Sequence, residues 1–245
     1  MYKQVKLFVK KIIPQEFLFK NELLFKKALI PFYKGNKYSC IICGKSWKKF
    51  ISLDDHDLLC PYCGSRSRTR RLFKILNERN DLKGKVLHFS PSRSLFRIFK
   101  EDYRFSYYST DFENEFLADY KLDITKIDMP NNSFDTIICY HILEHIEEDQ
   151  MAMEELLRVL KPNGKCYIQT PFKTGGIYED YSIKSPEKRL EAFGQEDHVR
   201  IYSIEGLTER LNNIGFKTEH LQFEEEKSPN GLLSESVIIA SKPLM

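Results

Sequence analysis

The sequence predicts an α/β protein in which a doubly wound, mostly parallel sheet fills the C-terminal two thirds of the chain. From about residue 84 onward, strand-like apolar runs alternate with helix-like amphipathic runs across short turns, which is typical of parallel sheets with right-handed crossovers. Two closely spaced cysteine pairs precede this region, and 245 residues suffice for one full α/β domain and a small appendage. We therefore expect a basic helical segment over residues 1–36, a zinc-binding module over 37–71 and the α/β domain over 72–245.

Each element of the predicted sheet domain depends on its own local pattern. Strands are short apolar runs bounded by turn residues, and helices place apolar residues at i, i+3, i+4 and i+7. The predicted elements, in order, are a strand at 85–90, a helix at 92–100, strands at 105–109 and 134–140, a helix at 149–161, a strand at 165–170 and a helix that begins near residue 203. The turn Pro162-Asn-Gly164 separates the second helix from the strand that follows it.

The front of the chain is strongly basic. The first 80 residues hold 18 Lys and Arg against 6 Asp and Glu, whereas the remainder holds 20 against 29. Residues 1–34 read as two short basic amphipathic helices, broken at Pro14 and ending near Pro31. A basic front end could meet nucleic acid, an anionic membrane or a phosphorylated substrate, or it could dock on the acidic remainder of the chain. Charge alone does not choose between these partners, although packing of the helices on the main domain is favoured over binding to a membrane surface.

The sequence contains no predicted transmembrane segment. No apolar run approaches the ~20 residues that a membrane-spanning helix requires. The N-terminus does not read as a signal peptide, because its apolar stretches are short and broken by lysines. We expect a cytoplasmic protein, and the sequence predicts no oligomeric state.

Four cysteines form two C-x2-C pairs, Cys40 with Cys43 and Cys60 with Cys63, separated by 16 residues. Each pair can form a tight turn that aims two thiolates at one point, and two such turns complete a tetrahedral four-sulfur zinc site. Glycines follow the second cysteine of each pair, where the turn favours a positive φ. Disulfides are the alternative, but a reducing cytoplasm disfavours them. A four-thiolate zinc has no open position, so we expect a structural ion in a zinc-ribbon-like module.

An arginine cluster follows the second cysteine pair, with four arginines between Arg66 and Arg71. Guanidinium groups suit bidentate pairing with phosphates or carboxylates. The alternative, slightly favoured, is a solvated basic start to the helix that Leu72 and Phe73 continue with an apolar face.

Several polar residues fall at the predicted carboxyl ends of the strands, where ligands of parallel sheets bind. Asp111 lies 21 residues after Ser90, close to the offset of about 20 residues at which an acidic residue meets ribose hydroxyls in nucleotide-binding folds. Asp123 is placed to meet an adenine edge, and Tyr140 and His141 close the third strand. Any one of these would more often be an ordinary loop or cap residue, so their joint placement carries the prediction of a nucleoside site.

Three motifs carry a family resemblance. They are Leu122-Asp-Ile124, Ser133-Phe-Asp-Thr-Ile-Ile-Cys-Tyr-His-Ile-Leu-Glu-His-Ile146 and Glu155-Leu-Leu-Arg-Val-Leu-Lys-Pro-Asn-Gly164. Together they resemble class I S-adenosylmethionine-dependent methyltransferases, in particular the type 11-like branch, over about residues 84–242. The resemblance implies a Rossmann-like methyltransferase fold with a seven-stranded sheet whose last strand, at residues 236–241, is antiparallel.

The resemblance also implies a role for each residue at the strand ends. Asp111 would bind the ribose, Asp123 and Ile124 would flank the adenine, and Tyr140 and His141 would line the methionine side of S-adenosylmethionine. Phe89, Ser90 and Pro91 would form the turn after the first strand. The family usually has a glycine-rich turn there, whereas this chain has His88-Phe-Ser-Pro-Ser-Arg93, which is similar to the His-Phe-Ala-Pro turn of some methyltransferases joined to cysteine modules.

A segment from Phe193 to Tyr202 is the predicted acceptor side of the site. It resembles an FGQxDHVRxY stretch in the same methyltransferase branch and lies where substrate-facing insertions commonly occur in this fold. His198 is the candidate general base, with Arg200 and Tyr202 as substrate contacts. The alternative for His198 is a loop histidine bonded to a backbone carbonyl.

The resulting functional hypothesis is an S-adenosylmethionine-dependent methyltransferase that acts on a small-molecule or glycan-like acceptor, with an anionic acceptor motivated by the basic front end. An RNA methyltransferase that grips the RNA backbone with the zinc module and the arginine cluster is a second hypothesis. A third is a catalytically inactive interaction protein that contains zinc and keeps a methyltransferase fold.

Overall fold

The computed structural model describes residues 21–24, 26–27, 30–53 and 56–244. They form two compact units. The N-terminal unit comprises the described residues up to Arg71 together with Glu226–Leu232, and the sheet unit comprises Leu72–Glu225 and the described residues from Leu233 onward. The predicted helix before Pro14 lies outside the described residues.

The N-terminal unit contains two small antiparallel hairpins around the cysteines. A short helix, α3 (Ile30–Tyr33), leads directly into β1 (Lys34–Ser39), which pairs with β2 (Ser46–Trp47), while β3 (Ile51–Ser52) pairs with β4 (Leu58–Leu59). The helix α4 (Ser67–Glu78) begins in this unit and ends in the sheet unit.

A segment distant in the sequence completes the N-terminal unit. The backbone N–H of Ser39 donates to the carbonyl of Pro229 at 2.9 Å, and the hydroxyl of Ser39 donates to the side chain of Asn230 at 3.0 Å. Residues 226–232 are therefore part of this unit, although they lie between the last two strands of the other.

The sheet unit is built on one six-stranded sheet with the order β11-β12-β8-β7-β5-β6. The strands are β5 (Gly84–Phe89), β6 (Phe105–Thr110), β7 (Phe134–Tyr140), β8 (Leu160–Gln169), β11 (Lys217–Phe223) and β12 (Glu235–Ser241). Strands β6, β5, β7 and β8 pair in parallel, whereas β12 is antiparallel to both β8 and β11. The predicted mostly parallel sheet and its antiparallel last strand are thus confirmed.

The prediction of seven strands is wrong by one. Beside β6, residues 119–122 make only an isolated bridge between Thr110 and Tyr120, and the chain then turns at Asp123, whose carbonyl accepts from the N–H of Lys126 at 3.1 Å. The short run Leu122-Asp-Ile124 is too brief and too charged to extend as an edge strand.

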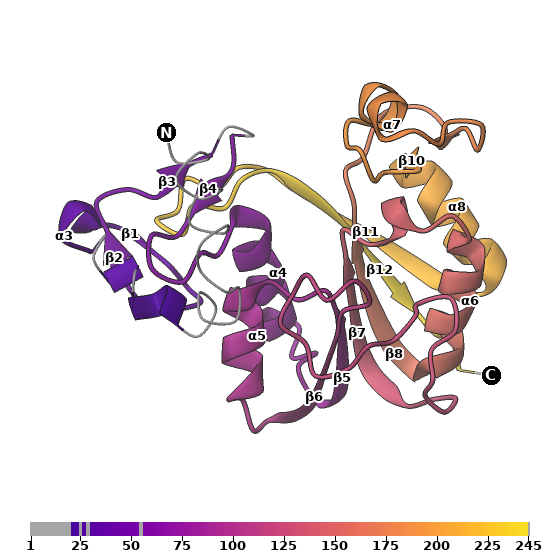
Figure 1. Ribbon diagram of the computed structural model, residues 1–245. Helices are drawn as coiled ribbons and strands as arrows, with labels where there is room; N and C mark the ends of the chain where they lie inside the picture. Colours follow the sequence, from indigo (N-terminus) through magenta and orange to yellow (C-terminus); the bar gives the residue numbers. More distant parts are fainter. Residues whose placement is uncertain (1–20, 25, 28–29, 54–55, 245) are drawn as a thin grey trace. The chain divides into compact units, whose positions relative to one another are not determined.

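Helices cover both faces of this sheet (Figure 1). The part of α4 in this unit and α5 (Arg93–Lys100) lie on one face, where the rings of Phe73 and Phe99 stack at 6.3 Å. Helices α6 (Asp149–Val159) and α8 (Ile204–Ile214) lie on the other. The helix predicted to begin near Ser203 is confirmed, because the Ser203 hydroxyl caps α8 by accepting from the N–H of Gly206 at 2.9 Å.

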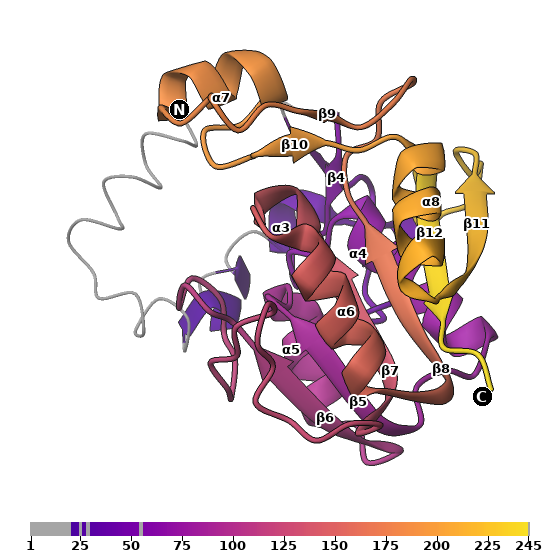
Figure 2. The same ribbon diagram turned by 90° about the vertical axis from the view of Figure 1, so that its right-hand side faces the viewer.

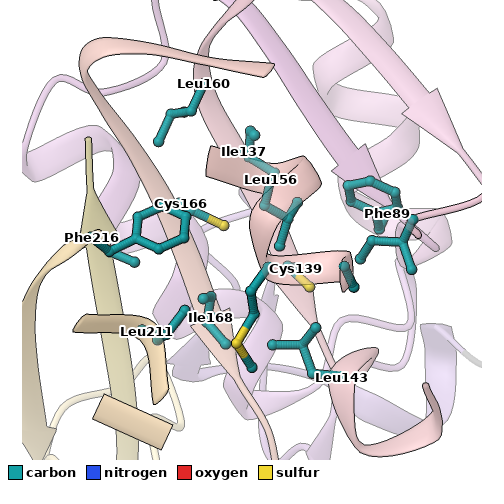
Figure 3. Close-up of a cluster of buried hydrophobic side chains, with 14 of the residues drawn as sticks. Phe89, Ile137, Cys139, Leu143, Leu156, Leu160, Cys166, Ile168, Leu211 and Phe216 are labelled. Atoms are coloured by element: carbon teal, nitrogen blue, oxygen red, sulfur yellow. The ribbon is translucent and has the colours of Figure 1, made fainter. Parts of the chain in front are cut away.

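The main hydrophobic core lies between the sheet and the helices α6 and α8 (Figure 3). Leu156 of α6 and Leu211 of α8 are fully buried there, as are Cys139 and Cys166 on the facing strands. The two cysteines act as small apolar core residues, and burial raises the pKa of both thiols above the ordinary range.

An insertion between β8 and α8 forms a separate layer at the end of the sheet unit (Figure 2). It contains β9 (Tyr178–Glu179), α7 (Pro186–Phe193) and β10 (Arg200–Ile201), and β9 pairs with β10 in antiparallel fashion. A short 3-10 turn, η1 (Leu143–His145), follows β7. These segments carry the residues predicted for the acceptor side.

Candidate functional site

Polar residues follow the parallel strands at their carboxyl ends, along one side of the sheet. Ser90 follows β5, Asp111 follows β6, His141 follows β7 and Thr170 follows β8. Ser90 and His141 have positive φ values, 43° and 56°. Positive φ is uncommon outside glycine and clusters where function over-determines the backbone. This edge is therefore the candidate ligand site, as the sequence predicts.

Ser90 and Asp111 form a pair that joins the ends of β5 and β6. The Ser90 hydroxyl donates to Asp111 Oδ1 at 2.7 Å, and the Ser90 N–H donates to the carbonyl of Thr110 at 2.7 Å. Ser90 thus adopts the left-handed conformation that a glycine would supply at this turn, and its side chain reaches the predicted ribose-binding carboxylate.

The Asp111 carboxylate is buried and largely satisfied within the protein, with only 4% of the residue exposed. Its Oδ2 accepts from the backbone N–H groups of Glu115 and Phe116 at 2.6 and 3.1 Å. A carboxylate offers about four acceptor positions, so the three hydrogen bonds leave room for about one more donor, such as a ribose hydroxyl.

The other residues predicted to hold the cofactor differ in how they are presented. Phe89, Pro91 and Ile124 are buried, and Phe89 and Ile124 belong to the main core (Figure 3 shows Phe89). Tyr140 is half-buried. Their contact with a cofactor stays a prediction.

Asp123 is exposed and caps its own turn. Its carboxylate accepts from the backbone N–H of Thr125 at 2.8 Å and from the Thr125 hydroxyl at 2.7 Å. Adenine recognition by Asp123 stays a prediction.

His141 is held by a buried glutamate. Its Nδ1 lies 3.1 Å from Glu144 Oε1, and its N–H donates to the carbonyl of Gln169 at 2.8 Å. Glu144 is only 1% exposed. Burial alone would raise the pKa of Glu144, but the hydrogen bond with His141 and the nearby histidines lower it, so the carboxylate is held ionised.

A cavity of about 260 Å³ lies beside Glu144. It is lined by Glu144, Pro171, Phe172, Lys173, Phe193, His198, Arg200 and Ile201. The cavity brings η1, the chain after β8 and the segment 193–201 together. The predicted acceptor segment therefore borders a cavity, and Lys173 contributes positive charge to its wall.

His198 is nearly fully buried at the cavity wall, with 3% of the residue exposed. It has a hydrogen bond with the backbone of Phe193, in line with the alternative of a carbonyl-bonded loop histidine. Its Nε2 atom is buried and has no hydrogen-bond partner among the residues described. Burial, followed by the neighbouring His145, lowers the pKa of His198, which keeps the ring neutral near pH 7.

The prediction that Arg200 and Tyr202 contact the substrate requires correction. Arg200 is fully buried and donates to backbone carbonyls within residues 143–147 and to Glu179 Oε2 at 2.9 Å. Tyr202 is also fully buried, and its hydroxyl donates to Asp149. Since their polar groups are used by the protein, both residues hold the cavity wall in place instead of presenting hydrogen-bonding groups to a substrate.

The convergence of Glu144, His145 and His198 is the feature that the sequence did not predict. One potential ligand atom from each lies within 4.8 Å of the others. The sequence shows Glu144-His145 as adjacent residues of metal-ligand type, but nothing local signals that residue 198 joins them.

The four predicted cysteine ligands converge in the N-terminal unit. Cys40 Sγ lies 3.6 Å from Cys63 Sγ, Cys43 Sγ lies 3.8 Å from Cys60 Sγ, and all four sulfurs lie within 4.8 Å of one another. Sulfurs at the corners of a tetrahedron with Zn–S bonds of about 2.3 Å would be about 3.8 Å apart. All six cysteines of the chain are free thiols, so the spacing fits a four-sulfur metal site.

The two cysteine turns have the same backbone pattern. The N–H of Gly44 donates to the carbonyl of Cys40 at 2.8 Å, and the N–H of Gly64 donates to that of Cys60 at 3.0 Å. Both glycines have positive φ, 68° and 73°, as their place after each second cysteine predicts. Cβ atoms there would be strained, so glycine is required by the turn.

Two of the four clustered arginines lie inside the N-terminal unit. Arg70 is fully buried and donates to the backbone carbonyls of Leu58, Ser65, Asn230 and Gly231, while Arg71, 1% exposed, pairs with Glu226. These two guanidinium groups join the cysteine turns to residues 226–232 and are not free to bind phosphates.

Comparison with known proteins places these features in a family context. Residues 70–168 match the family described as a methyltransferase domain. The chain is 31% identical to a sterol 24-C-methyltransferase of Yarrowia lipolytica over 108 residues, which is 41% of this chain and 26% of that protein. The chain thus spans about a quarter of the length of that curated relative.

Solved structures share the fold at low sequence identity. A 1,6-didemethyltoxoflavin N1-methyltransferase of Burkholderia thailandensis, solved with S-adenosylhomocysteine, is 16% identical with a TM-score of 0.50 over 71% of this chain and 78% of that one. The YcgJ protein of Bacillus subtilis is 13% identical with a TM-score of 0.50 over 71% and 98%. The [4+2]-cyclase SpnF is 17% identical with a TM-score of 0.50 over 73% and 82%.

The sheet unit has a Rossmann-like methyltransferase fold with a mostly parallel, six-stranded sheet. Residues 70–168 thus match a methyltransferase-domain family, and solved structures at 13–17% identity share the fold of the sheet unit. Because SpnF shares the fold, likeness of fold alone does not specify the reaction. Within the part of the chain that the structure describes, no helix is long and apolar enough to cross a membrane.

Proposed function

We propose that this chain transfers a methyl group from S-adenosylmethionine to a small-molecule or glycan-like acceptor that enters the cavity beside Glu144. The observation that carries the proposal is the meeting of two features at one edge of the sheet. A buried carboxylate, Asp111, stands at the predicted ribose position, and the segments that follow the neighbouring strands β7 and β8 line a cavity whose wall includes His198 and Lys173.

S-adenosylmethionine supplies an electrophilic methyl group on a sulfonium, so the chain's own residues have to bind, orient and exclude water. Asp111 would accept a hydrogen bond from the ribose, and Ser90 would hold that carboxylate in place through the 2.7 Å hydrogen bond. Asp123, Ile124, Tyr140 and His141 are proposed to line the adenine and methionine parts of the same site, with Phe89 and Pro91 packing beneath the turn.

On the acceptor side we propose that His198 acts as general base for a hydroxyl or a protonated amine. Support comes from its buried Nε2 at the cavity wall, which has no hydrogen-bond partner in the described part of the chain, and from its lowered pKa. Lys173 in the same wall favours an acceptor that carries negative charge.

In the N-terminal unit we propose a structural zinc ion held by Cys40, Cys43, Cys60 and Cys63. The convergence of the four sulfurs supports it, because their spacing is close to that of a tetrahedral four-sulfur zinc site. Four protein ligands leave no open position, so the ion would stabilise this unit and would not take part in methyl transfer.

The RNA hypothesis is less well supported than the small-molecule one, since Arg70 and Arg71 are buried and bonded within the protein. An inactive interaction protein is the remaining alternative. The three hypotheses differ in where a labelled methyl group would appear.

The test is transfer of radiolabelled methyl from S-adenosylmethionine to two fractions of a cell extract, one of molecules below 3 kDa and one of purified RNA. We expect label in the small-molecule fraction and a loss of at least about 10-fold with Asp111→Asn, because a hydrogen bond to a charged group is worth about 1.5–3 kcal/mol. Label only in RNA would favour the second hypothesis, and label in neither fraction would favour the inactive protein.

A further inference from the structure

Glu144, His145 and His198 form a compact set of metal-ligand side chains outside the cysteine cluster. One potential ligand atom from each lies within 4.8 Å of the others. Glu144 and His198 are almost completely buried, with 1% and 3% of each residue exposed, and the side chain of His145 is 29% exposed. One carboxylate and two imidazoles thus converge beside the cavity, whose wall includes Glu144 and His198.

Two of these side chains have a buried polar atom without a hydrogen-bond partner among the described residues. Glu144 Oε1 interacts with His141, whereas Glu144 Oε2 is buried and, within the described ranges, has no hydrogen-bond partner. The same holds for His198 Nε2. A buried acceptor without a partner is costly, and a cation between a carboxylate oxygen and an imidazole nitrogen would satisfy both.

The second atom of each candidate ligand is held by a partner, as is usual around metal sites. His145 Nδ1 lies 3.1 Å from Asp197 Oδ2, and His198 is hydrogen-bonded to the backbone of Phe193. Glu144 is held through Oε1 by His141 at 3.1 Å. These contacts orient all three side chains before any ion is bound.

The backbone that carries the three residues is fixed. The N–H of Val199 donates to the carbonyl of Glu144 at 2.9 Å, which joins the segment around residue 198 to η1. The buried guanidinium of Arg200 donates to backbone carbonyls within residues 143–147 on the same turn. Ligands that must meet at one point need such rigid support.

We propose that Glu144, His145 and His198 bind a divalent first-row transition-metal ion as a second, open metal site of this chain. One carboxylate and two histidines leave coordination positions free, in contrast to the closed four-sulfur site. Because Glu144 and His198 also line the cavity, the free positions face it and take a water or an oxygen atom of a bound molecule. A metal-bound imidazole nitrogen cannot accept a proton, so the general-base role proposed for His198 belongs to the metal-free chain and the ligand role to the metal-bound chain.

The test measures the number of bound metal ions and requires neither S-adenosylmethionine nor turnover. Its result is therefore independent of whether the proposed methyl transfer occurs. Full-length protein loaded with one zinc per chain is titrated with Co²⁺ and passed through a desalting column, and both metals are then counted by mass spectrometry. We expect one Co²⁺ per chain with weak visible d–d bands, as nitrogen and oxygen ligands give. A strong thiolate-to-cobalt absorption with release of zinc would instead place the cobalt at the cysteines and would overturn the proposal.

Variants separate a true site from adventitious binding. His198→Ala and the partly exposed His145→Gln should each lose the cobalt while keeping the zinc and the far-UV circular dichroism of the wild type. Asp197→Asn should weaken cobalt binding by about 10-fold or more. His220→Gln, which changes an exposed histidine on β11, should bind as the wild type does. Equal cobalt binding by the wild type and both histidine variants would contradict the assignment, as would a wild type that binds no cobalt at all.

Discussion

Ser90, directly after β5, combines a strained backbone conformation with a hydrogen bond to Asp111. Its φ of 43° is a conformation that costs a residue with a Cβ about 1–2 kcal/mol. The hydrogen bond from its hydroxyl to the buried Asp111 carboxylate offsets part of this cost. The residue therefore stands where the family usually has a glycine and uses its side chain to position the Asp111 carboxylate.

This balance predicts different effects for two substitutions of Ser90. Ser90→Gly relieves the strain and loses the hydrogen bond, so its unfolding free energy should stay within about 1 kcal/mol of the wild type. Ser90→Ala keeps the strain and loses the bond, so it should be less stable than Ser90→Gly by about 1 kcal/mol or more. Urea unfolding followed by circular dichroism measures both, and an alanine variant as stable as the glycine variant would refute the balance.

For single residues, the sequence predicts which side chains can bind a metal better than it predicts how buried a side chain is and which groups it contacts. The cysteine spacing alone identifies four sulfurs that do converge. Arg200 and Tyr202 are predicted substrate contacts because their segment resembles a substrate-facing insertion of the family, yet both are buried against groups from distant elements such as Glu179 and Asp149. Such partners have no local sequence signal.

The strand β5 carries a buried histidine, His88, whose protonation makes the free energy of unfolding depend on pH. His88 is 3% exposed, its Nδ1 lies 3.1 Å from the Tyr107 hydroxyl, and its ring packs on Phe99 of α5. Burial lowers the pKa of His88 from 6.5 to about 3. The folded state therefore keeps this histidine neutral over a range in which the unfolded chain takes up a proton.

The lowered pKa of His88 predicts a loss of stability in acid. Well above pH 6.5 the histidine is neutral in both states and contributes no pH dependence. As the pH falls below that value the unfolded state gains the proton, and by pH 5 the loss relative to pH 7 should reach about 2 kcal/mol. Urea unfolding at both pH values measures it, with His88→Gln as the comparison. The variant should show a smaller difference between the two pH values by about that amount, and an equal difference in both proteins would mean that His88 does not carry the effect.

At the level of elements, long apolar runs are predicted well and short charged ones are not. The strands β5, β6 and β7 and the helix α6 appear close to their predicted ranges, because each has a regular pattern of apolar residues that are buried in the structure. The seventh strand that the family resemblance implies is absent from the described sheet, where the chain beside β6 forms a single bridge between Thr110 and Tyr120.

Across the whole chain, two units differ in what stabilises them. The sheet unit has a large apolar core, whereas the N-terminal unit depends on the four cysteines and on Arg70, which links it to residues 226–232. That returning segment could not be predicted from the sequence, because residues 226–232 are joined to the cysteine turns only by contacts distant along the chain.

The same division places the proposed chemistry in the sheet unit alone. The strand-end carboxylate, the cavity and the Glu144, His145 and His198 set all belong to it, and the cysteine cluster supports a different part of the chain. Loss of the proposed zinc should therefore act on stability before it acts on the cofactor.

The central claim is that Asp111 binds the nucleoside of S-adenosylmethionine at the edge of the sheet. Isothermal titration calorimetry with S-adenosylhomocysteine tests it directly on folded, zinc-loaded protein. We expect saturable heat for the wild type and an affinity at least about 10-fold weaker for Asp111→Asn. The control is Asp102→Asn, which should bind as the wild type does, because Asp102 precedes β6 and so lies at the opposite end of that strand from Asp111. No heat from the wild type at millimolar ligand, or an unchanged affinity for Asp111→Asn, would contradict the account.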